Sequence, residues 1–240
     1  MRPDVSVIID KVGVSVSESL GATASAVLYG SAARGEHLDD YSDINVLLVT
    51  QSLEPLVLQR LRAAIEPLRA HSRVPPLIFT FDEWRRSADV FPIEIVDMQV
   101  ARRILAGADP LERMVVAPAD LRRALEREFR GKLLRLRQAY ALLDDQPALL
   151  AETVVRSLSV LGVLFRATLV LADGGAPIAT PETIERAATV IGFDAEPVLS
   201  IYQERGINRP AVGRSTTEQY LMAVDRAVQF IDQFHLGGTP

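Results

Sequence analysis

Hydrophobic residues change their spacing along this chain in the segment from Gly107 to Pro118. Before that segment, short apolar runs alternate with stretches of helical period. After it, as far as Phe234, apolar residues recur only at the three- and four-residue spacing of helices. Such a switch places an α/β part before an all-helical part. We therefore predict an α+β protein with domains at 1–112 and 113–240, the first built on a small mixed β-sheet and the second a helical bundle.

The first part is predicted to contain strands where apolar and β-branched residues gather. They are expected at Ser25–Tyr29, Ile44–Val49, Leu77–Phe81 and Ile93–Met98. Helices are expected at 4–20, at 53–70 and, with Asp82 as the N-cap, at 82–88. Trp84 is expected to pack beneath this short helix.

The second part is predicted to be helical throughout. One stripe runs over 121–140, and further helices are expected at about 147–172, 181–191, 195–205 and 216–235. The most apolar segment, 154–172, contains Arg156 and Arg166, and each would cost ~2.5–3.5 kcal/mol near a bilayer centre. We therefore expect a buried bundle helix in which these arginines are paired interior charges. A second set of arginines lies at 123, 127, 130 and 137. We expect them on a solvated face of their helix. The alternative is that they form a basic surface that faces a bound triphosphate.

Charge and composition limit the partners of the chain. The net charge of −5 argues against a broad surface for nucleic acid. Cysteine is absent from the sequence, so any metal must be held by oxygen or imidazole. The first residues lack the layout of a signal peptide, and we expect a cytoplasmic protein with no membrane partner. The bundle has enough apolar surface for a homodimer, although no patch demands one.

The most informative segment is Leu28–Val49, LYGSAARGEHLDDYSDINVLLV. It resembles the signature of the polymerase-beta-like nucleotidyltransferase superfamily, of the minimal or aminoglycoside type. In that signature a Gly-Ser follows a first strand, and an Asp-x-Asp begins the next strand about a dozen residues later. Here Gly30-Ser31 stand in the first place, Arg34-Gly35 follow as in many members, and Asp43-Ile44-Asn45 stand in the second.

This resemblance implies a nucleotide-binding site at Gly30, Ser31 and Arg34. A helix starting at Ser31 would offer its free N–H groups to phosphate oxygens, and Gly30 would let the backbone approach closely. The loop residue His37 is expected to be exposed to solvent.

The resemblance also implies a divalent metal, Mg²⁺ or Mn²⁺, with an NTP as substrate. Asp43 and Asn45 would point the same way from one strand and share the metal. Members of the superfamily place a third carboxylate on a nearby strand, and the candidate here is Glu94, between two isoleucines. We therefore expect metal ligands at Asp43, Asn45 and Glu94, with Asp43 and Glu94 as the catalytic carboxylates.

Asn45 departs from the family pattern because its amide oxygen coordinates Mg²⁺ without supplying negative charge. If one ligand charge is worth ~3–4 kcal/mol in the transition state, the rate falls by ~10²–10³-fold. A slow enzyme, an enzyme with a changed metal arrangement and a nucleotide-binding pseudoenzyme all remain open.

The leading hypothesis is a nucleotidyltransferase of the EC 2.7.7 type, which moves a nucleoside monophosphate from an NTP to a hydroxyl of a small-molecule acceptor. One alternative is a non-catalytic nucleotide-binding or protein-interaction module. Another is adenylylation of a protein partner, which the minimal nucleotidyltransferases suggest.

Overall fold

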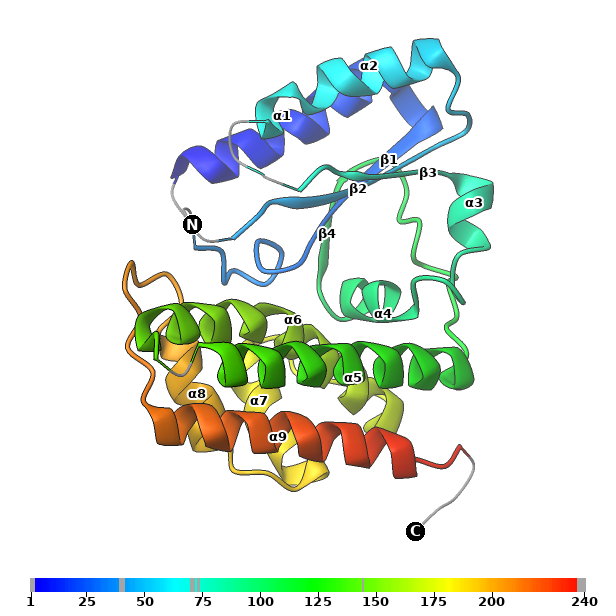
Figure 1. Cartoon of the computed structure of the whole chain (residues 1–240). Helices are drawn as coiled ribbons and strands as arrows, with labels where there is room; N and C mark the ends of the chain where they lie inside the picture. The colour runs from blue at the N-terminus through cyan, green and yellow to red at the C-terminus, as the bar shows by residue number, and fades with distance from the viewer. Residues whose placement is uncertain (1–2, 39–41, 70–71, 73, 144, 237–240) are drawn as a thin grey trace. The chain divides into compact units, whose positions relative to one another are not determined.

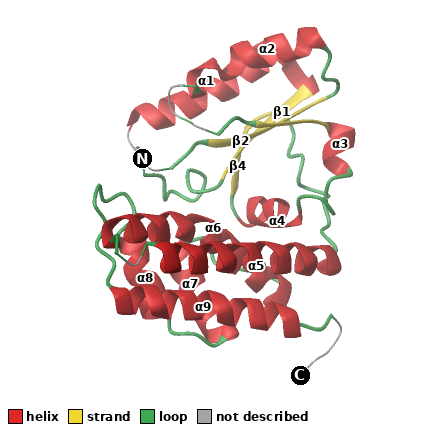
Figure 2. Ribbon diagram, in the orientation of Figure 1, coloured by secondary structure: helices red, strands yellow, loops and turns green. Residues whose placement is uncertain are grey.

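The computed structural model describes residues 3–38, 42–69, 72, 74–143 and 145–236 (Figure 1). The chain forms two compact units, residues 1–116 and 117–240. The first contains a mixed sheet with helices, whereas the described residues of the second form helices and loops (Figure 2). This architecture confirms the predicted α+β class.

The N-terminal unit begins with a long helix and ends with an edge strand. Its elements are α1 (Pro3–Leu20), η1 (Gly21–Thr23), β1 (Ala24–Tyr29), β2 (Asn45–Thr50), α2 (Pro55–Ile65), η2 (Glu66–Leu68), β3 (Leu77–Thr80), α3 (Phe81–Arg85), α4 (Pro92–Val100) and β4 (Arg102–Ala106). The predicted helix 4–20 and the first three predicted strands are confirmed within a few residues. The predicted helix 53–70 ends early, because the chain tightens to a 3₁₀ turn around Pro67.

The described strands form a four-stranded sheet of order β3-β2-β1-β4. Strand β1 runs antiparallel to β2 and β4, and β3 runs parallel to β2. One face of the sheet packs on α1 and α2 through Leu28, Val46 and Leu48. The other face, which carries Val27 and Leu47, packs on α3 and α4 (Figure 1). We call this second face the α4 face.

The prediction of a strand at Ile93–Met98 is wrong, because these residues lie in helix α4. Pro92 stands at the start of the helix, where no amide donor is needed. The first turn of the helix is closed by a hydrogen bond of 3.0 Å from the Ile95 amide to the Phe91 carbonyl. Six of the nine residues of α4 are buried, four of them in an unbroken run from Ile95 to Met98, so its apolar pattern has no helical period and resembles that of a buried strand.

The fourth strand is β4 instead, at the edge of the sheet beside β1. Its first residues, Arg102 and Arg103, hide it from a search for apolar runs, although charged residues are common on edge strands. A second correction concerns α3, whose N-cap is Thr80 and not Asp82. The Thr80 hydroxyl accepts from the Glu83 amide at 3.1 Å, and the Glu83 carboxylate accepts from the Thr80 amide at 2.8 Å, which completes a capping box.

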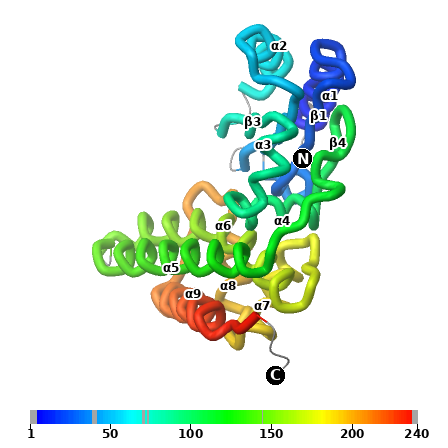
Figure 3. The backbone as a smooth tube through the Cα atoms, turned by 90° about the vertical axis from the view of Figure 1, so that its right-hand side faces the viewer, coloured from blue at the N-terminus to red at the C-terminus, as the bar shows by residue number. Residues whose placement is uncertain are grey.

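In the described residues of the C-terminal unit, the five predicted helices are all present, each within a few residues of its expected place. They are α5 (Pro118–Leu142), α6 (Pro147–Asp173), α7 (Thr180–Ile191), α8 (Ala195–Gln203) and α9 (Arg214–Gln233). Helix α5 packs against α6 and α9 (Figure 3). The arginines at 123, 127, 130 and 137 all pair with acidic residues of this unit, which agrees with a solvated face.

Helix α6 is long and apolar enough to cross a membrane by length and composition, and 61% of its apolar 18-residue window is buried within the protein. Its Arg166 side chain is fully buried and donates to the carbonyl oxygens of Pro177 and Ile178 at 3.2 Å. These contacts agree with a helix in the core of a bundle. Arg156, in contrast, is not an interior charge, because 76% of its side chain is exposed and it faces Glu152 at 4.0 Å.

Candidate nucleotide site

The segment after β1 forms a tight turn from Gly30 to Glu36. Gly30 has a φ of +74°, a left-handed conformation that favours glycine. The Arg34 amide donates to the Gly30 carbonyl at 3.2 Å, and the Glu36 amide donates to the Ser31 carbonyl at 2.9 Å. The helix that we considered at Ser31 does not form, since the chain makes a single turn and then continues as a loop. We call residues 30–36 the glycine-serine turn.

The hydrogen bonds that close this turn come from the amides of Arg34, Gly35 and Glu36. Among the described residues, the amides of Ser31, Ala32 and Ala33 take no part in the hydrogen bonds that close the turn. Consecutive amides in such a turn make a concavity suited to anions. The turn can therefore serve phosphate without a helix behind it.

Asn45 is the first residue of β2, and Asp43 lies two residues before it, just outside the strand. Both side chains are partly buried, whereas Ile44 between them is 1% exposed. Asn45 pairs directly with Tyr29 of β1. Since Val27 pairs with Leu47 on the α4 face, the alternation of strand residues places Tyr29 and Asn45 on that same face.

The side chain of Asn45 lies against the glycine-serine turn. A Cβ atom added to Gly30 would stand 2.7 Å from Asn45 Nδ2. The absence of a side chain at Gly30 thus makes room for the amide of Asn45. The two halves of the sequence motif are brought into contact by the pairing of β1 with β2.

The acidic residues near this contact come from outside the sheet. None of the described strands contains an aspartate or glutamate, and β3, beside β2, consists of Leu77, Ile78, Phe79 and Thr80. The third carboxylate that we expected on a strand, Glu94, is instead an exposed residue in the first turn of α4.

Glu94 is nevertheless within electrostatic reach of the end of β1. Burial, and then the charges of Glu94 and Asp97, raise the pKa of Tyr29 to about 12. Two carboxylates of α4 therefore act on a phenol that is paired with Asn45. Tyr29 and Asp97 were not among the expected site residues, and a tyrosine directly before Gly30 was the one sequence signal that could have suggested the first.

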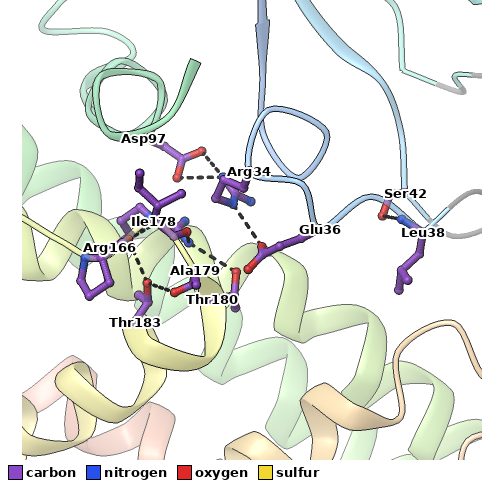
Figure 4. A network of polar contacts seen from close by, with 11 residues as sticks. Arg34, Glu36, Leu38, Ser42, Asp97, Arg166, Ile178, Ala179, Thr180 and Thr183 are labelled. Atoms are coloured by element: carbon purple, nitrogen blue, oxygen red, sulfur yellow. Dashed lines mark hydrogen bonds and ion pairs between the residues drawn. The ribbon is translucent and has the colours of Figure 1, made fainter. Parts of the chain in front are cut away.

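Arg34 is held by two carboxylates (Figure 4). Its Nη1 lies 3.2 Å from Asp97 Oδ2, and its Nε lies 3.2 Å from Glu36 Oε2. The three side chains are only 7%, 6% and 12% exposed. His37, which follows, is also buried at 5% exposure, so the expected exposed histidine is wrong. Trp84 is 1% exposed and packs on Phe79, as expected of a packing residue.

In the part of the chain that the structure describes, there is no group of three or more histidine, cysteine, aspartate or glutamate residues that could hold a metal ion. Of the expected ligands, Asn45 lies against the turn, and Asp43 precedes it by two residues in the chain. Mg²⁺ is often bound by one or two carboxylates together with the phosphates of its substrate. These residues fit an ion that arrives with a triphosphate, and they do not fit a site preformed for the bare ion.

Residues 10–99 match the family model described as a nucleotidyltransferase domain. The N-terminal unit carries a nucleotidyltransferase domain. This match includes the glycine-serine turn, both strands of the motif and most of α4. A comparison with curated proteins found no match.

The fold is similar to that of spectinomycin adenyltransferase AAD(9) from Enterococcus faecialis, solved with ATP and spectinomycin. The likeness has a TM-score of 0.55 at 14% sequence identity, and it covers 92% of this chain and 98% of that chain. It therefore extends beyond the nucleotidyltransferase domain into the helices that follow. At this identity the likeness concerns the fold.

Proposed function

We propose that the protein binds a nucleoside triphosphate at the glycine-serine turn and transfers the nucleoside monophosphate to a hydroxyl of a small-molecule acceptor, with pyrophosphate as the leaving group. The observation that carries this proposal is the contact between Gly30 and Asn45 inside a nucleotidyltransferase domain. The fold likeness to an adenyltransferase solved with ATP and an antibiotic supports a small-molecule acceptor.

Each site residue has a proposed part in this reaction. The Ser31 hydroxyl and the first amides of the turn would donate to phosphate oxygens. Asp43 and Asn45 would contact a Mg²⁺ or Mn²⁺ ion carried by the triphosphate, and the ion would neutralise part of its charge. Glu94 is proposed as the further carboxylate, directed at the same place from α4. Asp43 is the one anionic group of the strand motif, so it is proposed to orient the attacking hydroxyl.

The first experiment measures melting temperature with each NTP, with and without Mg²⁺. Binding predicts a rise with one or more NTPs in the presence of Mg²⁺ and no rise with Mg²⁺ alone. The second measures transfer of label from an α-³²P NTP to a panel of aminocyclitol and aminoglycoside acceptors. The absence of an NTP-dependent rise would refute the proposed site.

A second candidate function is nucleotide binding without transfer. It is favoured by the absence of any carboxylate from the described strands and by the amide at residue 45. This candidate predicts the same rise in melting temperature with NTP but no labelled product with any acceptor. Label transfer at any rate above that of Asp43→Asn would exclude it.

A further inference from the structure

We infer that Arg34 is a positioning residue, which fixes the glycine-serine turn to helix α4 through Asp97, and that it does not itself contact the nucleotide. This inference rests on the proposed function, because it concerns the turn that is proposed to bind phosphate. It assigns a role to Asp97 that the sequence motif does not contain. It also replaces the expectation that Arg34 binds nucleotide.

The contacts of Arg34 leave little of it for a ligand. Nη1 approaches both oxygens of Asp97, at 3.4 and 3.2 Å, and Nε approaches Glu36 at 3.2 Å. Only 7% of the Arg34 side chain is exposed. A phosphate that bound Nη1 or Nε would have to displace a buried carboxylate from that atom.

The backbone of Arg34 is part of the turn itself. Its amide donates to the Gly30 carbonyl at 3.2 Å, so the residue that binds α4 also closes the turn on Gly30. Its side chain also bonds Glu36, the last residue of the turn. A displacement of Arg34 would therefore shift Gly30, which makes room for Asn45.

Helix α4 is a firm support for this contact. Asp97 is flanked by Val96 and Met98, which are 3% and 0% exposed, and Ile95 is buried completely in the core of the α4 face. Close packing of this kind resists displacement of the helix. A charge-assisted pair between a packed helix and a loop, here at 3.2 Å, restricts the position of the loop.

The test compares Asp97→Asn, Arg34→Gln, Arg34→Lys and the double variant Arg34→Gln/Asp97→Asn. Affinity for Mg²⁺ with a non-hydrolysable ATP analogue is measured well below every melting temperature. Positioning predicts that Asp97→Asn and Arg34→Gln each weaken binding by about tenfold, and that the double variant is no weaker than either. Arg34→Lys also loses affinity, because one ammonium cannot bond both carboxylates as the guanidinium does.

Direct binding of phosphate by Arg34 predicts different results for the same variants. If Arg34 binds phosphate directly, Asp97→Asn leaves affinity unchanged or tightens it by releasing the guanidinium, and Arg34→Lys retains binding. Either result overturns the inference. Two controls separate positioning from loss of stability: Leu61→Ala removes core packing on α2, and Asp10→Asn breaks the Arg103 ion pair on the other face of the sheet. Both are expected to keep wild-type affinity.

Hydrogen exchange provides a readout that does not need nucleotide. Asp97→Asn should speed exchange of the Arg34 and Glu36 amides, which close the turn, relative to amides of α1. Unchanged exchange at both amides would show that Asp97 does not hold the turn. If the wild type binds no NTP, the proposed function fails, while exchange still decides whether Asp97 fixes the turn.

Discussion

A Cβ atom on Gly30 would stand 2.7 Å from Nδ2 of Asn45, and no residue other than glycine fits at this contact without moving the amide. Gly35 provides a matched comparison. It has a φ of +76°, close to the +74° of Gly30, but an added Cβ would meet nothing within 4 Å. The two glycines thus share a backbone conformation and differ in their neighbours.

Gly30→Ala and Gly35→Ala are each expected to destabilise the fold by about 1–2 kcal/mol, because both place a side chain in the left-handed region. Gly30→Ala should in addition displace Asn45 and abolish NTP-dependent stabilisation. Gly35→Ala should keep it. Melting temperatures of both variants with and without Mg²⁺ and NTP measure the difference, and equal NTP responses would place Asn45 outside the site.

Asn45→Asp adds one negative charge beside the turn with almost no change in size. Without metal the fold should lose about 1 kcal/mol, since the new carboxylate lies near Asp43. A cation at ~4 Å interacts with a carboxylate by ~4 kcal/mol at an effective dielectric constant of ~20, so Mg²⁺ should reverse the loss. Nucleotidyl transfer should rise about tenfold or more.

The measurement for Asn45→Asp is the melting temperature with Mg²⁺ alone, which needs no substrate. The wild type is expected to show no response, because its donor set fits only an ion that arrives with phosphate. The variant is expected to respond. An identical response in the two proteins would show that residue 45 does not contact the metal.

Ser31→Ala should weaken NTP binding by about 1–2 kcal/mol, the value of a hydrogen bond to a charged group. The fold should change little in stability. Titration calorimetry measures the affinity, and Ser17→Ala, at an exposed position of α1, is the control. Wild-type affinity in Ser31→Ala would remove this hydroxyl from the phosphate site.

We predict that the folded protein loses stability at high pH because the phenol of Tyr29 ionises there. Burial, with Glu94 and Asp97, raises the pKa of its phenol to about 12, so the folded protein holds the proton more tightly than the unfolded chain. The resulting stabilisation is complete below pH ~10 and is lost as the pH rises from about 10 to about 12, and it amounts to no more than about 3 kcal/mol. Denaturation across this range should show a smaller loss in Tyr29→Phe.

The pKa of Tyr29 also reports whether Glu94 lies close to its phenol. Glu94→Gln should lower the pKa of Tyr29, because one of the negative charges that raise it is removed. Absorbance of phenolate near 295 nm follows the titration, and Tyr29→Phe identifies its contribution. Asp82→Asn on α3 is the control. If the two charge deletions have equal effects, Glu94 has no special proximity to the end of β1.

Sequence patterns predicted the long helices because each offers several turns of apolar repeat. In helix α6, for example, the apolar repeat continues through both Leu158 and Phe165, so the spacing of apolar residues predicts one long helix. Helix α4 was mistaken for a strand because it is only nine residues long and its buried residues run without a break from Ile95 to Met98, so that its apolar spacing shows no helical period. There Glu94 stands out only as a polar residue among apolar ones.

The candidate site also has one part that the sequence predicts and another part that it does not. Gly30 and Asn45 lie within one motif, and pairing of β1 with β2 brings them together. The bond between Arg34 and Asp97 joins residues 63 positions apart, and it depends on α4 being a helix. No spacing rule connects such residues, since their proximity is decided by packing of the sheet on α4.

The packing of α9 has a consequence for synthesis on the ribosome. Helix α5 contacts both α6 and α9, yet α9 is the last of the described helices to be translated. Until Tyr220, Val224 and Ile231 emerge, the nascent chain presents the apolar stripe of α5 and the long apolar α6 without the helix that completes their cover. Newly made chains should therefore depend on chaperones until α9 has emerged, and a stop codon near Gly213 should yield an aggregating product.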